Sequence, residues 1–195
     1  MSTLEVNTIT PQSGTTLTLG GSGQTIAIGS GATAGFGKIG QVISTNLSST
    51  VSISSSSTSS FFDITGLSVN ITPTSTSSKI YISYLCNIAV GAGSKHVRLM
   101  RDSTAINIGD AGQANQIRSS STSRPAATIY DLDIAPVGGN FLDSPNTTSQ
   151  VTYKLQATLG ASYSNTIYIN RSVSDSNNDF MARTSSNITV MEVLA

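Results

Sequence analysis

The side chains that could take part in catalysis are few and scattered along this chain of 195 residues. Its one histidine, His96, begins the segment HVRLMRD, and no serine or cysteine nucleophile can be ordered around it. Glycoside hydrolysis needs two carboxylates across a cleft. The candidates, Asp131 and Asp133 in YDLDI, would lie about 7 Å apart on one strand face. We interpret His96 as an ordinary strand residue and the aspartates as solvated, so the sequence predicts no catalytic residue and no enzyme.

A second set of residues bears on metal and phosphate binding. The segment SDSNNDF places Asp175, Asn177 and Asp179 at alternate positions, as at the start of a calcium loop. The glycine and the distal acidic residue of an EF-hand are missing. The glycine runs GGSGQ and GSGATAGFG are not followed by the Lys-Ser/Thr of a phosphate loop. We interpret SDSNNDF as a polar hairpin tip and the glycine runs as turns, and we expect no metal site and no cofactor.

Composition limits the partners that the chain can have. Ten basic and ten acidic residues give a net charge of zero, and only 10% of the residues are charged. Because no basic field is present, we expect neither nucleic acid nor an anionic membrane surface as a partner. The single cysteine, Cys86, lies in an apolar run, which indicates a small buried hydrophobe. No signal peptide and no apolar stretch of membrane-spanning length is visible.

From residue 38 onward the sequence predicts successive β-strands separated by Ser, Asn, Gly and Pro clusters. QVTYKLQATLG alternates strictly between apolar and polar residues, so it has a dry face and a wet face. KIYISYLCNIAV has one apolar row and one mixed row, which predicts a strand covered on both sides. In FFDITGLSVNIT the alternation shifts at Gly66, which indicates a bulge. Further strands are expected at 39–47, 96–108, 127–135, 165–171 and 187–194.

The last predicted strand, NITVMEVLA, is apolar on both of its faces. One row contains Ile188, Val190 and Leu194 with Glu192 interrupting it, and the other contains Thr189, Met191 and Val193. Such a strand can lie at the centre of a sandwich. Alternatively, its second face lines a subunit interface, where an apolar patch is kept from water.

The opening 37 residues have a different texture from the rest of the chain. The motif L-x-L-G at 17–20 recurs nine positions later as I-x-I-G at 26–29, and each copy is followed by a small-residue turn. Strands this short cannot bury their own apolar side chains, but stacking against identical neighbours would bury them. We therefore expect residues 1–37 to be an attachment and trimerisation segment, intertwined with its copies, and residues 38–195 to form a β-sandwich.

Several segments are more distinctive together than any motif within them. The most specific are DITGLSVNITP (Asp63–Pro73) and LDSPNTTS (Leu142–Ser149), accompanied by GKIGQVISTN, HVRLMRDSTAI, NTIYINRS, SSNITVMEV and the opening STLEVNTI. Over nearly the whole chain they resemble tail-fibre-like and structural virion proteins of tailed bacteriophages, particularly those of marine bacteria. The resemblance implies an all-β, jelly-roll-like antiparallel sandwich that forms a trimeric knob. It also implies an N-terminal segment that attaches to the particle, and it brings no catalytic residues.

Three functions follow as hypotheses. The first is a homotrimeric virion structural protein, a short fibre, spike or decoration of head or tail, with other virion proteins as partners and the particle surface as its location. The second is a receptor-binding tip whose loops 109–126 and 136–149 contact host surface glycans, with Tyr163 and Phe141 as the aromatic candidates for stacking on sugar rings. The third, a depolymerase, is disfavoured because a suitable acid pair is missing.

Overall fold

The structure is a computed structural model that describes residues 9–10, 22, 38–54, 60–91, 93–110, 112–124, 131–160 and 166–194. The chain divides into two units, Met1–Gly37 and Lys38–Ala195. The predicted L-x-L-G and I-x-I-G strands and the long glycine runs lie outside the described residues, so the fold below is that of the second unit. Within the described ranges, no helix is both long enough and apolar enough to cross a membrane.

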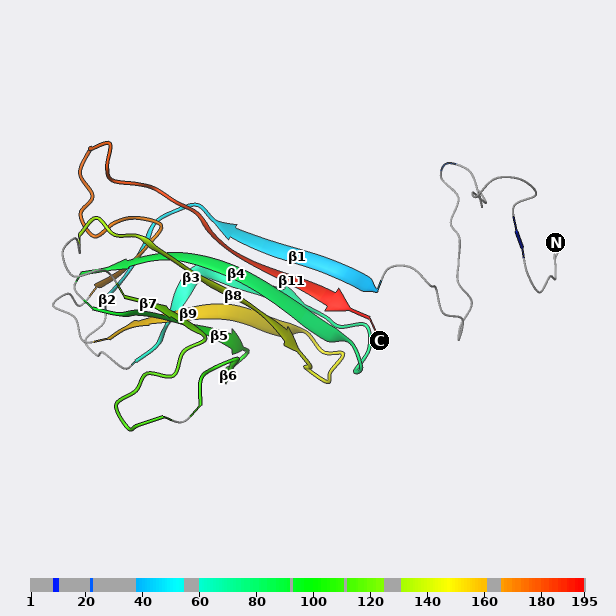
Figure 1. The fold of residues 1–195 in the computed structure, drawn as a ribbon. Coiled ribbons are helices and arrows are strands. Elements are labelled where there is room, and N and C mark those ends of the chain that lie inside the picture. Colours follow the sequence, from blue (N-terminus) through cyan, green and yellow to red (C-terminus); the bar gives the residue numbers. More distant parts are fainter. Residues whose placement is uncertain are drawn as a thin grey trace. The chain divides into compact units, whose positions relative to one another are not determined.

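Two antiparallel sheets form the second unit (Figure 1). The first sheet contains β1 (Ile39–Leu47), β2 (Val51–Ser54), β4 (Lys79–Val90), β8 (Ala135–Asp143), β10 (Thr166–Ile169) and β11 (Ser186–Val193). The second contains β3 (Phe62–Ile71), β5 (Lys95–Arg101), β6 (Thr104–Ile106), β7 (Ser121–Ser123) and β9 (Val151–Leu159). The expected all-β, jelly-roll-like antiparallel sandwich is thus confirmed for the described residues.

Several of these strands are successive pieces of one longer line. Strand β8 follows one edge of β4, so β11 and β10 must share the other edge, one after the other. Strands β1 and β2 continue each other in the same way alongside β11 and β10. In the second sheet, β6 and β7 share one edge of β5, opposite β9. When strands that continue each other are counted as one, each of the two sheets has four strands side by side in the described part. This is the arrangement of a jelly-roll-like sandwich.

The core lies between the two sheets and consists of the apolar rows that the sequence predicts. The inward residues of β9 and β4 are all at most 3% exposed: Val151, Tyr153, Leu155, Ala157 and Leu159, and Ile80, Ile82, Tyr84, Cys86, Ile88 and Val90. Each buried Leu or Ile side chain contributes about 1.5–3 kcal/mol. The alternation therefore encodes the inner face of both sheets. The outer face of β4 is only partly covered within the described chain, because Leu85 is 38% exposed whereas Ala89 on the same face is fully buried.

The predicted bulge in β3 is confirmed. Gly66 has a φ of 88°, and the register between β3 and β9 shifts between Asp63 and Ser68. An L-residue is strained at this φ, whereas glycine is not. The bulge brings Leu67 onto the buried face while Ile64 before it is also buried. The extra residues of β3 at this shift therefore allow both halves of the strand to face the core.

Three strand predictions need correction. The segment 96–108 is a hairpin of β5 and β6, because the chain turns at Asp102, which has a φ of 52°. Of the predicted strand 127–135, residues 131–134 form a turn and loop, and the strand begins only at Ala135; the residues before 131 lie outside the described part. The predicted loop 136–149 is mostly strand β8, which pairs with β4 along nine residues. Pro136 and two glycines make this segment look like a loop in the sequence. Strand β8 can contain them because it lies at the edge of the sheet.

Candidate functional site

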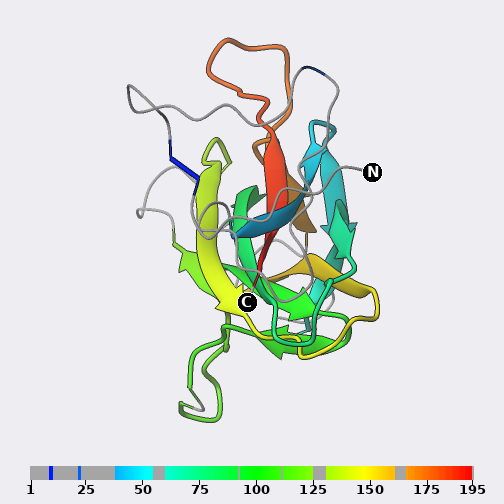
Figure 2. The same cartoon turned by 90° about the vertical axis from the view of Figure 1, so that its right-hand side faces the viewer.

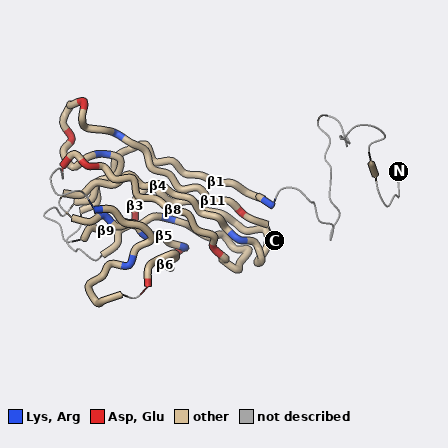
Figure 3. The backbone as a smooth tube through the Cα atoms, in the orientation of Figure 1, with Lys and Arg blue, Asp and Glu red and all other residues tan. Residues whose placement is uncertain are grey.

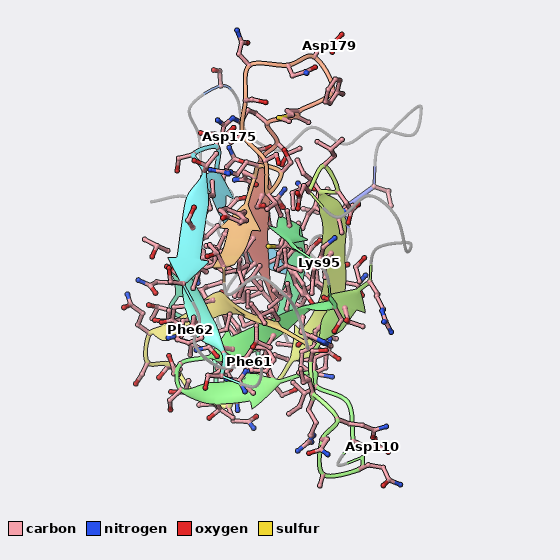
Figure 4. All side chains as sticks on the ribbon, turned by 90° about the vertical axis from the view of Figure 1, so that its left-hand side faces the viewer. Phe61, Phe62, Lys95, Asp110, Asp175 and Asp179 are labelled. Carbon is pink, nitrogen blue, oxygen red and sulfur yellow. The ribbon has the colours of Figure 1, made fainter. Side chains whose placement is uncertain are left out.

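Two loops protrude from the middle of strand lines, and both are candidates for contact with a partner. One is the segment 107–120 between β6 and β7, and the other is the segment 170–185 between β10 and β11. They leave the sandwich on opposite sides (Figure 2). In Figure 4, Asp110 marks the first loop, and Asp175 and Asp179 mark the second. Because each loop interrupts a strand line, its ends must be held together for the line to continue.

Ser120 closes the first loop. Its backbone N–H donates to the carbonyl of Val97 at 2.9 Å, and its Oγ accepts from the N–H of Leu99 at 2.9 Å. The same hydroxyl lies 3.2 Å from the carbonyl oxygen of Ile106, to which it donates. A single serine thus satisfies the backbone of β5 where neither β6 nor β7 reaches it. The loop can therefore project without breaking the sheet.

The first loop encloses a hollow of about 330 Å³, lined by Gly109, Asp110, Gly112, Gln116, Ile117, Arg118 and Ser119. Arg118 Nε donates to the carbonyl of Gly109 at 2.8 Å, which leaves the two Nη groups without a hydrogen-bond partner among the described residues. Gln116 Oε1 accepts from the N–H of Gln113 at 2.7 Å and holds the loop in a turn. Asp110 is exposed. A carboxylate and a guanidinium at one shallow hollow are groups that can bind hydroxyl-rich ligands.

Asn170 closes the second loop. It is fully buried with a φ of 62°, and its Nδ2 donates to the carbonyls of Leu47 and Ser49 at 2.8 and 2.9 Å. Its Oδ1 accepts from Ser186 Oγ at 2.7 Å, and that hydroxyl in turn accepts from the N–H of Asn87 at 2.9 Å. These bonds join the gap between β1 and β2 to the gap between β10 and β11. Nothing in the local sequence marks Asn170 for this role, because a buried asparagine in NRSVSDS looks like any loop residue.

The second loop contains the predicted calcium-like segment, but its first acid is already paired. Asp175 accepts from Arg171 Nη1 at 3.2 Å and from Arg183 Nη2 at 2.6 Å. The Arg171 guanidinium also lies over the Tyr168 ring, 4.4 Å from its centroid. Among the described residues, no group of three or more His, Cys, Asp or Glu side chains is placed to hold a metal ion. Asp175 therefore braces the loop, and the exposed Phe180 lies near its tip.

The residues singled out for catalysis do not come together. Asp131 and Asp133 lie in the turn and loop before β8 and not on a strand face; Asp131 is exposed, and Asp133 pairs with the buried Lys95. His96 lies on β5 as predicted, with Nε2 at 2.8 Å from Ser94 Oγ. Burial lowers the pKa of His96, because its charged form is less well solvated.

The described interior contains a second buried ionic group, at the end of β8. Arg101 Nη1 donates to Asp143 Oδ1 and Oδ2 at 2.9 and 3.0 Å, and the Tyr153 hydroxyl donates to Oδ2 at 2.7 Å. Arg101 and Tyr153 belong to the second sheet, whereas Asp143 belongs to the first. Burial and the neighbouring carboxylate raise the pKa of Tyr153, so its proton stays in place to bond Asp143. The group fastens one sheet to the other.

The aromatic residues proposed to stack on sugars are not available on the described surface. Phe141 is half-buried and packs against the core, because alternate residues of β8 face inward. Tyr163 lies outside the described residues. Cys86 is fully buried as predicted, and burial raises the pKa of its thiol to about 12. Of the two predicted binding loops, the described part therefore retains one candidate binding site, the hollow in the loop 107–120.

The fold and its loops define a braced antiparallel β-sandwich with two protruding loops. No protein-family model matches the chain, and no curated protein matches it significantly. Among solved structures it is similar to the infectious bursal disease virus Gt strain (10% identity, TM-score 0.36) and to the VP2 subviral particle of that virus (12% identity, TM-score 0.37). Each alignment covers 88% of this chain and 42% of the other, so the chain spans less than half of the chains it matches. Similarity at these TM-scores carries no functional information to this chain.

Proposed function

We propose that the chain is a non-enzymatic virion structural protein of a tailed bacteriophage, a homotrimeric short fibre, spike or decoration held to the particle through residues 1–37. The observation that carries the proposal is the position of the two most specific segments of the phage resemblance. Asp63–Pro73 forms the bulged strand β3, and Leu142–Ser149 supplies Asp143 to the brace between the sheets. Both segments build the framework of the sandwich, so the resemblance concerns the fold and not a local motif.

The surface of the sandwich suits a particle component. Lys, Arg, Asp and Glu are sparse along β1 and β11 (Figure 3), and the net charge of the chain is zero. The described ionic groups hold loops and sheets together, as Asp175 and Asp143 do. These contacts hold the loop 170–185 and the two sheets in place, which favours resistance to proteases outside the cell.

Two measurements test this proposal. Light scattering of the full chain should give three times its mass of 20.1 kDa. Antibodies against residues 38–195 should bind intact phage particles that contain the chain. A monomeric mass at every concentration would refute the homotrimer. Antibody binding that appears only after the particles are disrupted would refute a position on the particle surface.

A second candidate function is recognition of a host surface glycan, and the hollow in the loop 107–120 favours it. Its polar lining includes the carboxylate of Asp110 and the Nη groups of Arg118, which bond no described residue and can bond neighbouring hydroxyls of a sugar. A glycan array of host surface sugars tests it. Arg118→Ala should abolish any signal that the native chain gives, whereas Arg124→Ala, an exposed arginine after β7, should retain it. Equal signals from both variants would place binding elsewhere.

A further inference from the structure

The outer face of the first sheet carries an apolar row that crosses four neighbouring strands. In the strand register, Val42 of β1 is opposite Met191 of β11, Met191 is opposite Tyr81 of β4, and Tyr81 is opposite Leu142 of β8. Residues paired across antiparallel strands point to the same face. Val42 is 57% exposed and Leu142 is 46% exposed, at the two ends of the row. The row thus spans the full width of the sheet, open to solvent in the described chain.

The complete apolar row lies toward one end of the sheet, and Leu85 is a single exposed apolar residue beyond the polar row. Toward that end, Ile39 is 49% exposed and lies opposite Val193, whose partner on β4 is the exposed Lys79. On the other side, the next registered row is wholly polar and consists of Ser44, Thr189, Ser83 and Asn140. Apolar rows of this kind mark surfaces that another surface covers.

We infer that this apolar row is the surface through which copies of the chain associate; the inference rests on the proposed homotrimer and assigns its interface. The row contains no charged side chain, so copies can bring their rows together without burying an unpaired charge. The two interpretations of NITVMEVLA differ in what covers its second face. Along β11, the side chains of Thr189, Met191 and Val193 are half-exposed on the outer face of the sheet, whereas the alternate side chains, which include Glu192, face inward.

The place where the chain enters the sandwich identifies a second copy as the occupant. The carbonyl of Lys38 accepts from the N–H of Leu194 at 2.6 Å, so the chain enters β1 beside the end of β11, at the apolar end of the sheet (Figure 1). The 37 residues before Lys38 contain the two short repeats that we expect to pack against identical neighbours. Copies that meet through the row bring their Lys38 residues close together, so their repeats start side by side. An unrelated partner on the row would leave the repeats of different copies apart.

Single cysteines introduced into the full chain test the inference. The native Cys86 is buried and its pKa is raised to about 12, so it contributes little background reactivity. Leu142→Cys places a thiol in the row, and Ser68→Cys places one at an exposed position on the opposite sheet. At concentrations where light scattering shows an oligomer, the Leu142→Cys thiol should react with a maleimide at least about tenfold more slowly than the Ser68→Cys thiol.

Charge substitutions supply a second readout on the same oligomer. Val42→Lys should weaken association by about tenfold or more, because copies would then bury like charges, and Ser44→Lys in the polar row should change it far less. Equal maleimide rates with the oligomer intact, or equal effects of the two lysines, would overturn the inference and leave the homotrimer standing. A chain that is monomeric at every concentration would overturn both.

Discussion

The carboxylate of Asp143 is the polar group that ties the two sheets together at the end of β8. It is 6% exposed and accepts bonds from Arg101 and from the Tyr153 hydroxyl. Removing a buried partner leaves the others unpaired, which costs far more than losing an exposed ion pair. The strength of this contact therefore comes from its position between the sheets and not from charge alone.

Asp143→Ala should lower the free energy of unfolding by about 3–5 kcal/mol, because Tyr153 and Arg101 lose their acceptor inside the protein. Urea unfolding of the native chain and the variant measures the change. The matched control is Asp63→Ala, which removes the 54% exposed partner of Lys154 and should cost about 1 kcal/mol or less. Similar costs for the two variants would show that Asp143 does not fasten the sheets.

Glu192 is a fully buried acid on β11 whose oxygens accept from the backbone N–H and hydroxyl of Thr74 at 2.6 and 2.7 Å and from Gln41 at 2.7 Å. Burial by itself would raise the pKa of Glu192, but these hydrogen bonds outweigh it and lower the pKa below its ordinary value of 4.5. Glu192 therefore stabilises the fold above pH 4.5, and the contribution is lost as the pH falls through the lowered pKa.

The variant Glu192→Gln should make that contribution visible. We expect it to lower the free energy of unfolding by about 1–3 kcal/mol at neutral pH, because the amide N–H₂ replaces one carboxylate oxygen and then faces the donors of Thr74 or that of Gln41. The gap between the native chain and the variant should narrow as the pH falls below 4.5. Urea midpoints at several pH values measure it, and a gap that does not depend on pH would contradict the assignment.

Both protruding loops rely on side chains to replace missing strand pairing. Ser120 completes the edge of β5, and Asn170 with Ser186 completes the line of β10 and β11. In each case a short polar side chain takes the place of a backbone group of the interrupted strand. The sandwich can therefore carry a loop in the middle of a sheet edge without exposing unsatisfied backbone inside.

Asn170→Gly tests this closure, because glycine tolerates the positive φ but lacks the side-chain amide. The variant should lower the free energy of unfolding by about 1–3 kcal/mol and speed hydrogen exchange in β2 and β10. Asn146→Gly is the control: Asn146 also has a positive φ, 53°, and is exposed. It should change stability by about 0.5 kcal/mol or less. Equal effects would mean that the Asn170 amide does not hold the gap closed.

The sandwich as a whole has a polar outer face on one sheet and a partly apolar one on the other. On the second sheet, Asp63 accepts from Lys154 and Gln156, and Arg98 donates to Gln156 while its guanidinium stacks over Phe61 at 4.0 Å. The first sheet carries the uncharged row from Val42 to Leu142 instead. This asymmetry predicts that self-association is driven by apolar contact.

Association of the full chain should therefore be insensitive to salt. Raising the NaCl concentration from about 0.1 M to about 1 M shortens the Debye length from about 10 Å to about 3 Å, which weakens contacts between exposed charges. Light scattering over this range should show an unchanged or slightly larger native mass. Dissociation at high salt would indicate an interface built from charges, and the apolar row would then not be the contact.

The sequence by itself determined the features that depend on local alternation: the all-β class, the inner faces of β4 and β9, the buried Cys86 and the bulge at Gly66. A period of two residues and a glycine at a phase shift are visible without knowing any neighbour. Strand β8 was missed, because Pro136 and its glycines read locally as a loop until pairing with β4 orders them.

Only the tertiary structure decided which residues meet across long separations in the chain. The register places Val42, Tyr81, Leu142 and Met191 in one row, although each reads alone as an ordinary strand residue. The folded chain likewise brings Asn170 to the gap between β1 and β2, and it places Asp143 where its carboxylate links the two sheets. Such contacts depend on strand order and register, which are set by the packing of the whole core and not by local pattern.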